Sequence, residues 1–245
     1  MRNNKTVIIC SLILCFSIIN PSLAQFKVNK NLKKLIPKKD EKLSTPEVTK
    51  GLKEALVKGV TKGAKKASAT DGFNKNKLIR IPFPDDMVKV KNKLNSMGMS
   101  KLVNDFELSL NRAAEKSAQK ATPIFVDAIN SMSVDDAWGV LKGDNRSATT
   151  YLKENTTNDL KESFNPVVKE SLDEAETTKY FDQIVTRYNK IPFVDKVNPN
   201  LEEYATAKAI DGLFTLVGQE EEKIRKDPAA RTSDTMKKVF NKDNW

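Results

Sequence analysis

The fold class follows from a stretch near the start of the chain, residues 45–67, which reads TPEVTKGLKEALVKGVTKGAKKA. Its apolar residues recur with the roughly 3.6-residue period of a helix that buries one face. Thr45, Pro46 and Glu47 supply an N-cap, a first-turn proline and an acid at the positive end of that helix. We therefore expect a helix that begins at Thr45.

Small residues occupy every fourth position of this helix. They are Gly51, Ala55, Gly59, Gly63 and Ala67. Such a row lets the backbone of another helix approach closely, because there is little side chain to keep it away. The alternative is a membrane-active amphipathic helix. Lys62 and Lys66 interrupt the apolar face, so we favour packing against a second helix.

Helical signals recur along the rest of the chain. We expect helices over residues 85–97, 100–121, 133–143, 145–152, 160–172 (bent at Pro166), 180–188 and 201–224, a kink or new start at Pro123, and a last short helix from Asp227 to about Phe240. Prolines make residues 71–84 a loop or short extended arm, and residues 191–199 are expected to form a loop. With no strand pattern and no internal repeat, the sequence predicts an all-α fold: a single multi-helix, bundle-like domain of about eight to ten helices, preceded by a basic N-terminal linker.

The first 24 residues have the layout of a secretory signal peptide. Arg2 and Lys5 precede an apolar run over residues 7–19, and Ser22 and Ala24 are small residues before a cleavage site. We expect residues 1–24 to be removed, residues 25–44 to form a basic flexible linker and residues 45–245 to form the helical domain. An uncleaved membrane anchor is the alternative, but the apolar run is shorter than the roughly 20 residues that span a bilayer.

This interpretation predicts an exported protein, periplasmic or extracellular, that contains neither cysteine nor histidine. Cys10 and Cys15 would leave with the signal peptide, and the chain has no histidine. No other segment is long and apolar enough to cross a membrane, so we expect no transmembrane segment after signal removal.

The chain is basic, with a formal net charge of +10, and the excess is concentrated near its start. Residues 27–66 contain 13 lysines and four acidic residues. We expect this region to be attracted to an anionic envelope surface, such as lipid, lipopolysaccharide or wall polymer, or to serve only as a solubilising tether. Nucleic acid is not an expected partner, because export separates the chain from it and no aromatic residues alternate with these lysines.

The absence of histidine excludes several chemistries. It removes the Ser-His-Asp triad, the Cys-His dyad and the usual zinc sites. The chain also lacks a glycine-rich phosphate loop and a calcium-binding loop, so we predict no cofactor, no metal site and no assigned catalytic residue. Asp, Glu, Lys and Tyr remain, and glycoside hydrolysis needs only two carboxyl groups, so a hydrolase of that class stays open.

A polar cluster is the candidate site. Only seven of the 42 basic residues are arginines, and several of these stand beside acidic partners. In the helix over residues 201–224, Glu221 falls inside the apolar stripe and Glu220 on its edge, while Arg225 follows Glu221 by one turn. A carboxylate that faces a core must be paired or protonated. The cluster consists of Arg80, Asn111, Arg112, Glu115, Glu220, Glu221, Arg225, Asp227 and Arg231. We expect an ion network that fixes the C-terminal helices, with a ligand-binding or catalytic pocket and a protein-partner surface as alternatives.

Several segments together resemble a known family. They are Gly51–Leu56, Asp71–Phe73, Ile79–Pro82, Asn111–Glu115, Pro123–Phe125, Asp136–Ala137, Ala148–Leu152, Phe164–Pro166, Gly212–Phe214, Glu220–Glu221 and Ile224–Arg231. The chain is similar through them to a bacterial family of exported proteins known as domain of unknown function 4197. The resemblance implies an exported helical domain, but it brings no established activity and therefore no residue role.

These observations lead to one functional expectation. We expect a non-enzymatic cell-envelope protein that binds an anionic or amphiphilic envelope component or a protein partner. The alternative is a carboxylate-dependent hydrolase acting on glycan, which requires two carboxyl groups in one open cleft.

Overall fold

Helices are the only regular elements in the part of the chain that the structure describes. The computed structural model describes residues 43–174, 177–194 and 200–244. The α-helices are α1 (Thr45–Ser68), α2 (Val88–Ser96), α3 (Ser100–Ala118), α4 (Ala121–Ser131), α5 (Val134–Lys142), α6 (Ser147–Glu174), α7 (Thr177–Asn189), α8 (Leu201–Lys226) and α9 (Asp234–Val239). Short 3₁₀ turns are η2 (Asp85–Met87), η3 (Pro228–Ala230) and η4 (Lys242–Asn244). Nine α-helices and no strand in these residues confirm the predicted all-α class.

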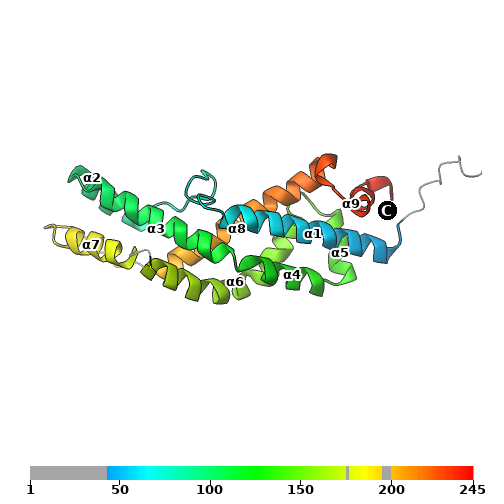
Figure 1. Ribbon diagram of the computed structural model, residues 1–245, viewed down its shortest axis with the longest axis horizontal. Coiled ribbons are helices and arrows are strands. Elements are labelled where there is room, and N and C mark those ends of the chain that lie inside the picture. The colour runs from blue at the N-terminus through cyan, green and yellow to red at the C-terminus, as the bar shows by residue number, and fades with distance from the viewer. Residues whose placement is uncertain (1–42, 175–176, 195–199, 245) are drawn as a thin grey trace, which may run out of the picture. The chain divides into compact units, whose positions relative to one another are not determined.

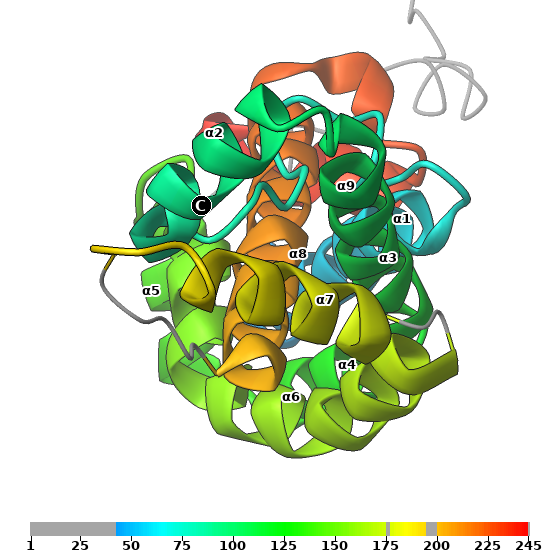
Figure 2. The same cartoon turned by 90° about the vertical axis from the view of Figure 1, so that its left-hand side faces the viewer.

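The long helices pack around α8. It contacts α1, α3 and α6, and Figure 2 shows it in the middle of the helices, with α6 below it. α4 packs on α1 and α6, while α7 packs on α3 and α2 (Figure 1). The largest fully buried side chains are Phe73, Phe83, Phe106, Phe125 and Phe164. Most buried apolar residues form one hydrophobic cluster, and Ala55, Ile224 and Met236 form a second, small one.

The row of small residues on α1 is the surface against which α8 and α9 pack. All five residues of the row are buried. A Cβ atom at Gly63 would lie 3.1 Å from the backbone nitrogen of Val217 in α8. A Cβ atom at Gly51 would lie 2.5 Å from Cγ2 of Val239 in α9. The prediction that this row serves close helix packing is confirmed.

The start of α1 differs by one residue from the expectation. Ser44, rather than Thr45, is the N-cap, and Thr45 and Pro46 already belong to the helix. The backbone N–H of Ser44 donates to Oε2 of Glu47 at 2.9 Å, and its hydroxyl donates to the same atom at 2.6 Å. The reciprocal Ser44–Glu47 capping box fixes the first turn.

α6 corrects the expectation of two helices over residues 145–172. The structure has one helix of 28 residues with Pro166 inside it. Its buried residues recur every fourth position: Ala148, Leu152, Thr156, Leu160, Phe164 and Val168. This continuous stripe packs against α3, α4 and α8. Burial along the whole stripe outweighs the hydrogen bond that a proline inside a helix removes.

Two other expectations near helix ends are refined. α3 ends at Ala118 and α4 begins at Ala121, so Pro123 belongs to a new helix rather than to a kink. Near the C-terminus, the expected single helix from Asp227 to Phe240 is wrong, because residues 231–233 separate η3 from α9. Ser233 is the N-cap of α9 and accepts a hydrogen bond from the backbone N–H of Met236.

Some predictions lie outside the described residues. These are the signal peptide over residues 1–24, nearly all of the linker and the part of the 191–199 loop from residue 195 on. The description of the protein as cysteine-free needs correction, because the full chain contains Cys10 and Cys15. It holds only for a chain from which the predicted signal peptide has been removed.

Candidate functional site

Residues 69–84, the segment that joins α1 to η2, lie along one face of α3 and are bound there by polar side chains. We call this segment the 69–84 loop. Oε1 of Glu115 accepts hydrogen bonds from the backbone N–H groups of Phe73 and Asn74, at 3.1 and 3.2 Å. Asn111 binds Ile81 twice: its Oδ1 accepts from the backbone N–H at 2.8 Å and its Nδ2 donates to the carbonyl at 2.9 Å. Side chains of α3 thus satisfy backbone groups that the loop cannot pair by itself.

Glu107 is the third polar residue on this face, one turn before Asn111. Its carboxylate is buried, and Oε1 accepts from the backbone N–H of Phe83 at 3.2 Å. Arg80 donates to Oε2 at 2.6 Å and Lys91 donates to Oε1 at 2.5 Å. Burial raises the pKa of Glu107, but the hydrogen bonds and charges of Lys91 and Arg80 outweigh this effect and hold it below its usual range. The carboxylate is therefore ionised and holds two cations in place.

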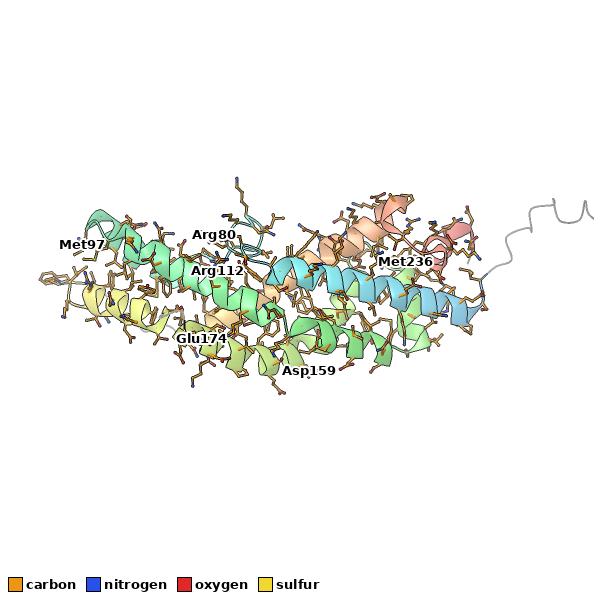
Figure 3. All side chains as sticks on the ribbon, viewed as in Figure 1. Arg80, Met97, Arg112, Asp159, Glu174 and Met236 are labelled. Carbon is orange, nitrogen blue, oxygen red and sulfur yellow. The ribbon has the colours of Figure 1, made fainter. Side chains whose placement is uncertain are left out.

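Arg112 connects α3 to the start of the loop. It donates to Oε2 of Glu115 at 2.5 Å and to Oδ1 of Asp71 at 2.7 Å. Lys75 also binds Asp71, at 2.7 Å. Hydrogen bonds from Lys75, Asn74 and Arg112 hold the pKa of Asp71 well below its usual range. Figure 3 shows Arg112 on α3 and Arg80 on the adjoining loop.

Glu220 repeats the arrangement between α8 and α1. Its side chain is only 4% exposed, and it binds Lys62 at 2.9 Å and also Lys66. Burial raises the pKa of Glu220, but the hydrogen bonds and charges of Lys66 and Lys62 lower it by more, so this carboxyl is also ionised. The two lysines that interrupt the apolar face of α1 thus have a buried partner.

We group these clusters as the basic face, because α1, which carries Lys62 and Lys66, packs on α3 and continues into the 69–84 loop. Its cationic residues are Lys62, Lys65, Lys66, Lys75, Lys77, Arg80, Lys91 and Arg112, and its carboxylates are Asp71, Glu107, Glu115 and Glu220. Three of the four carboxylates are buried, whereas the cations are exposed or half-buried. The face therefore presents an excess of four positive charges to solvent.

A second polar group joins α8 to the ends of α5 and α6. Glu221 accepts hydrogen bonds from the backbone N–H groups of Ala148 and Thr149, each at 2.8 Å, in the first turn of α6. Arg225 donates to Glu221 at 3.0 Å and to the carbonyls of Val140 and Leu141, at 2.7 and 3.2 Å, in the last turn of α5. The carboxylate thus lies at a positive helix end and the guanidinium at a negative one.

The remaining predicted residues bind the C-terminal end of α8. Arg231 donates to the carbonyls of Ile224 and Arg225, at 2.9 and 2.7 Å. Asp227 accepts from the backbone N–H of Ala229 at 2.9 Å and caps η3. The guanidinium carbons of Arg225 and Arg231 lie 6.0 and 5.7 Å from the ring centroid of Phe240. Arg225 and Arg231 therefore stabilise the connection between α8 and α9.

The predicted polar cluster is therefore two groups in the structure. Arg80, Asn111, Arg112 and Glu115 belong to the basic face, which Glu220 joins through α1, whereas Glu221, Arg225, Asp227 and Arg231 surround the end of α8. In the described parts of the chain, we find no hydrogen bond or ion pair between the two groups. Sequence reasoning missed Glu107 and Asp71. The four-residue spacing of Glu107, Asn111 and Glu115 was the available signal for the first of these.

The arrangement gives little support to carboxylate catalysis. Glu107 and Glu220 are held ionised by cations, whereas a general acid needs a raised pKa. A cavity beside Glu221 and Arg225 measures about 10 Å³, room for about one water molecule, and is otherwise lined mainly by apolar side chains such as Val217 and Ile224. Within the described ranges, no group of three or more acidic side chains is placed to hold a metal ion. No helix among those residues has the length and apolar character of a membrane span.

Comparison with known proteins bears on the family and not on an activity. No curated protein and no solved structure is significantly similar to the chain. Residues 42–241 match the family described as Protein of unknown function (DUF4197). The match includes every residue of the basic face and of the group around the end of α8. The chain therefore belongs to the DUF4197 family.

Proposed function

We propose that this protein is a non-enzymatic binding domain that attaches to an anionic phospholipid surface of the cell envelope through its basic face. The observation that carries the proposal is the placement of Glu107, Glu115 and Glu220. Each is buried and binds cations whose outer sides face solvent. These cations are already ordered before a ligand arrives, so binding loses less side-chain entropy than it would with free lysines.

Two lysines of the basic face have no acidic partner within the described residues and can bind an anionic ligand directly. Lys65 and Lys77 are exposed and form no ion pair within the described residues. Leu78, beside Lys77, is 68% exposed on the same loop. A cation next to an exposed apolar side chain suits the boundary between lipid headgroups and acyl chains.

The choice of phospholipid rests on charge and on the predicted export. Each lysine near an anionic membrane surface contributes about 1 kcal/mol of attraction. An excess of about four charges is then sufficient for reversible binding that salt weakens. The 25–44 segment, with its many lysines, would add to the attraction.

Vesicle co-sedimentation tests this proposal. The protein should bind vesicles that contain phosphatidylglycerol, bind neutral vesicles much less, and dissociate at high ionic strength. The double variant Lys65→Glu/Lys77→Glu should bind at least about thirtyfold more weakly, since it loses two lysines and gains two acids.

Lys161→Glu/Lys169→Glu on α6 is the matched control, because both lysines are exposed and outside the basic face. Equal weakening by the two double variants would mean that only net charge matters and would contradict a specific face. Binding to an envelope protein in the absence of any binding to vesicles would replace the lipid surface with a protein partner.

A further inference from the structure

A second exposed feature lies near the turn between α2 and α3 and the C-terminal end of α7. Met97 in the turn is 47% exposed, and Phe193 after α7 is fully exposed. Nη1 of Arg187 in α7 lies 3.5 Å from Sδ of Met99, which connects α7 to the turn before α3. In Figure 1 the ends of α2 and α7 both lie at the left, and α2 contacts α7; Figure 3 labels Met97 at the α2 end. We call Met97, Met99, Ile191 and Phe193 the apolar tip.

Phe193 contributes nothing to the core. Its backbone has a φ of 64°, in the left-handed region that bulky residues rarely occupy. A large apolar side chain in an unfavourable backbone conformation, without burial in return, is not explained by stability. Its exposure therefore points to contact with something outside the chain.

The charge around the apolar tip is mainly positive. Apart from Lys91, which binds Glu107 in the basic face, residues 88–104 and 183–194 contain Lys89, Lys93, Lys101, Arg187 and Lys190. The nearest acidic residues along the chain are Asp105, Asp182 and Asp195. Asp105, one turn beyond, is paired with Lys101 at 2.5 Å. An apolar centre with a mainly cationic rim is complementary to an anionic bilayer, whose acyl chains accept the apolar groups while its headgroups attract the rim.

We propose that the apolar tip inserts into the headgroup–acyl boundary of an anionic phospholipid bilayer, with Phe193 and Met97 as the inserting side chains. The inference shares its type of surface with the proposed function. It differs in residues and in physical basis, because insertion depends on apolar burial and survives salt, whereas attachment through the basic face does not.

Tryptophan placed at the tip tests insertion directly. Phe193→Trp is compared with Leu78→Trp, which puts the same probe on the 69–84 loop, and with the wild type, whose Trp138 and Trp245 give the background. On phosphatidylglycerol vesicles, the added emission of Phe193→Trp should shift to the blue and be quenched by lipids brominated in the acyl chain. An unshifted, unquenched Phe193→Trp signal on protein that sediments with vesicles would overturn the proposal.

A binding experiment separates the two proposals. At high ionic strength, the vesicle affinity of Met97→Ser/Phe193→Ser should be at least about tenfold lower than that of the wild type. Both side chains are exposed, so its thermal unfolding should match that of the wild type. If this variant weakens binding while Lys65→Glu/Lys77→Glu does not, attachment through the basic face is contradicted and insertion of the apolar tip is supported. The reverse result supports attachment through the basic face and contradicts insertion of the apolar tip. If the wild-type protein binds no vesicles, both proposals are contradicted.

Discussion

Glu221 and Arg225, one turn apart on α8, each bind the end of a different helix. Glu221 accepts hydrogen bonds from backbone N–H groups in the first turn of α6, and Arg225 donates to carbonyls in the last turn of α5. Four orphan groups at the two helix ends are thereby satisfied. The side chains of the pair are 5% and 10% exposed, so removing one partner leaves the other charge buried.

Glu221→Gln should therefore lower the free energy of unfolding by about 2–4 kcal/mol, because the neutral amide compensates neither the α6 N-terminus nor Arg225. Denaturant unfolding at neutral pH measures this change. Glu222→Gln is the adjacent control: Glu222 binds Lys226 and Arg146 on the surface and should have little effect. If both variants lose the same free energy of unfolding, the contacts of Glu221 with α6 and Arg225 contribute no more than those of a surface carboxylate.

At the scale of elements, the 69–84 loop is held from both sides. α3 binds its backbone, and α8 receives Phe73 at Gly212, where an added Cβ atom would lie 2.5 Å from Cε1 of that ring. Gly212→Ala should destabilise the protein by about 1–3 kcal/mol, because the buried ring has to move. Since the ring belongs to the basic face's loop, this variant should also weaken vesicle binding.

Gly139→Ala is the matched substitution in a helix with free space. A Cβ atom at Gly139 in α5 meets nothing within 4 Å. Alanine there should raise the free energy of unfolding by about 0.5–1 kcal/mol through its better helix propensity. Thermal and denaturant unfolding of both variants provide the comparison. Stabilisation by Gly212→Ala would contradict the close packing of the Phe73 ring against Gly212.

Elements with strong local signals could be predicted from the sequence, whereas long-range partners could not. The Asn200 cap correctly predicted α8, and the row of small residues correctly predicted α1. Both signals can be read from residues that are close together in the sequence. The sequence pattern predicts two helices over residues 145–172, but burial along the whole of α6 makes it one helix. Glu220 and Glu221 were recognised as core-facing carboxylates. Their partners, two lysines of α1 and the end of α6, are set by how α8 packs, which the sequence pattern of α8 alone does not contain.

At the scale of the whole molecule, ionised carboxylates hold the basic face together, and no imidazole titrates because the chain has no histidine. The pKa values of Asp71, Glu107 and Glu220 lie below their usual ranges in the folded protein. These groups therefore bind protons more weakly when folded. Their stabilisation is fully present above the usual pKa values, 3.8 for Asp and 4.5 for Glu, and is lost as the pH falls through the lower folded values.

The free energy of unfolding should then stay nearly constant from about pH 8 to about pH 5 and fall steadily below about pH 4.5. Urea unfolding across this range measures the profile. Glu107→Gln/Glu220→Gln should be less stable at neutral pH and lose less on acidification, because two of the responsible carboxyls are gone. A decline that begins between about pH 7 and pH 5 would mean that carboxyls are buried with raised pKa values. Such carboxyls would not order the surrounding lysines and arginines, and the basic face would lose the physical basis proposed for its binding.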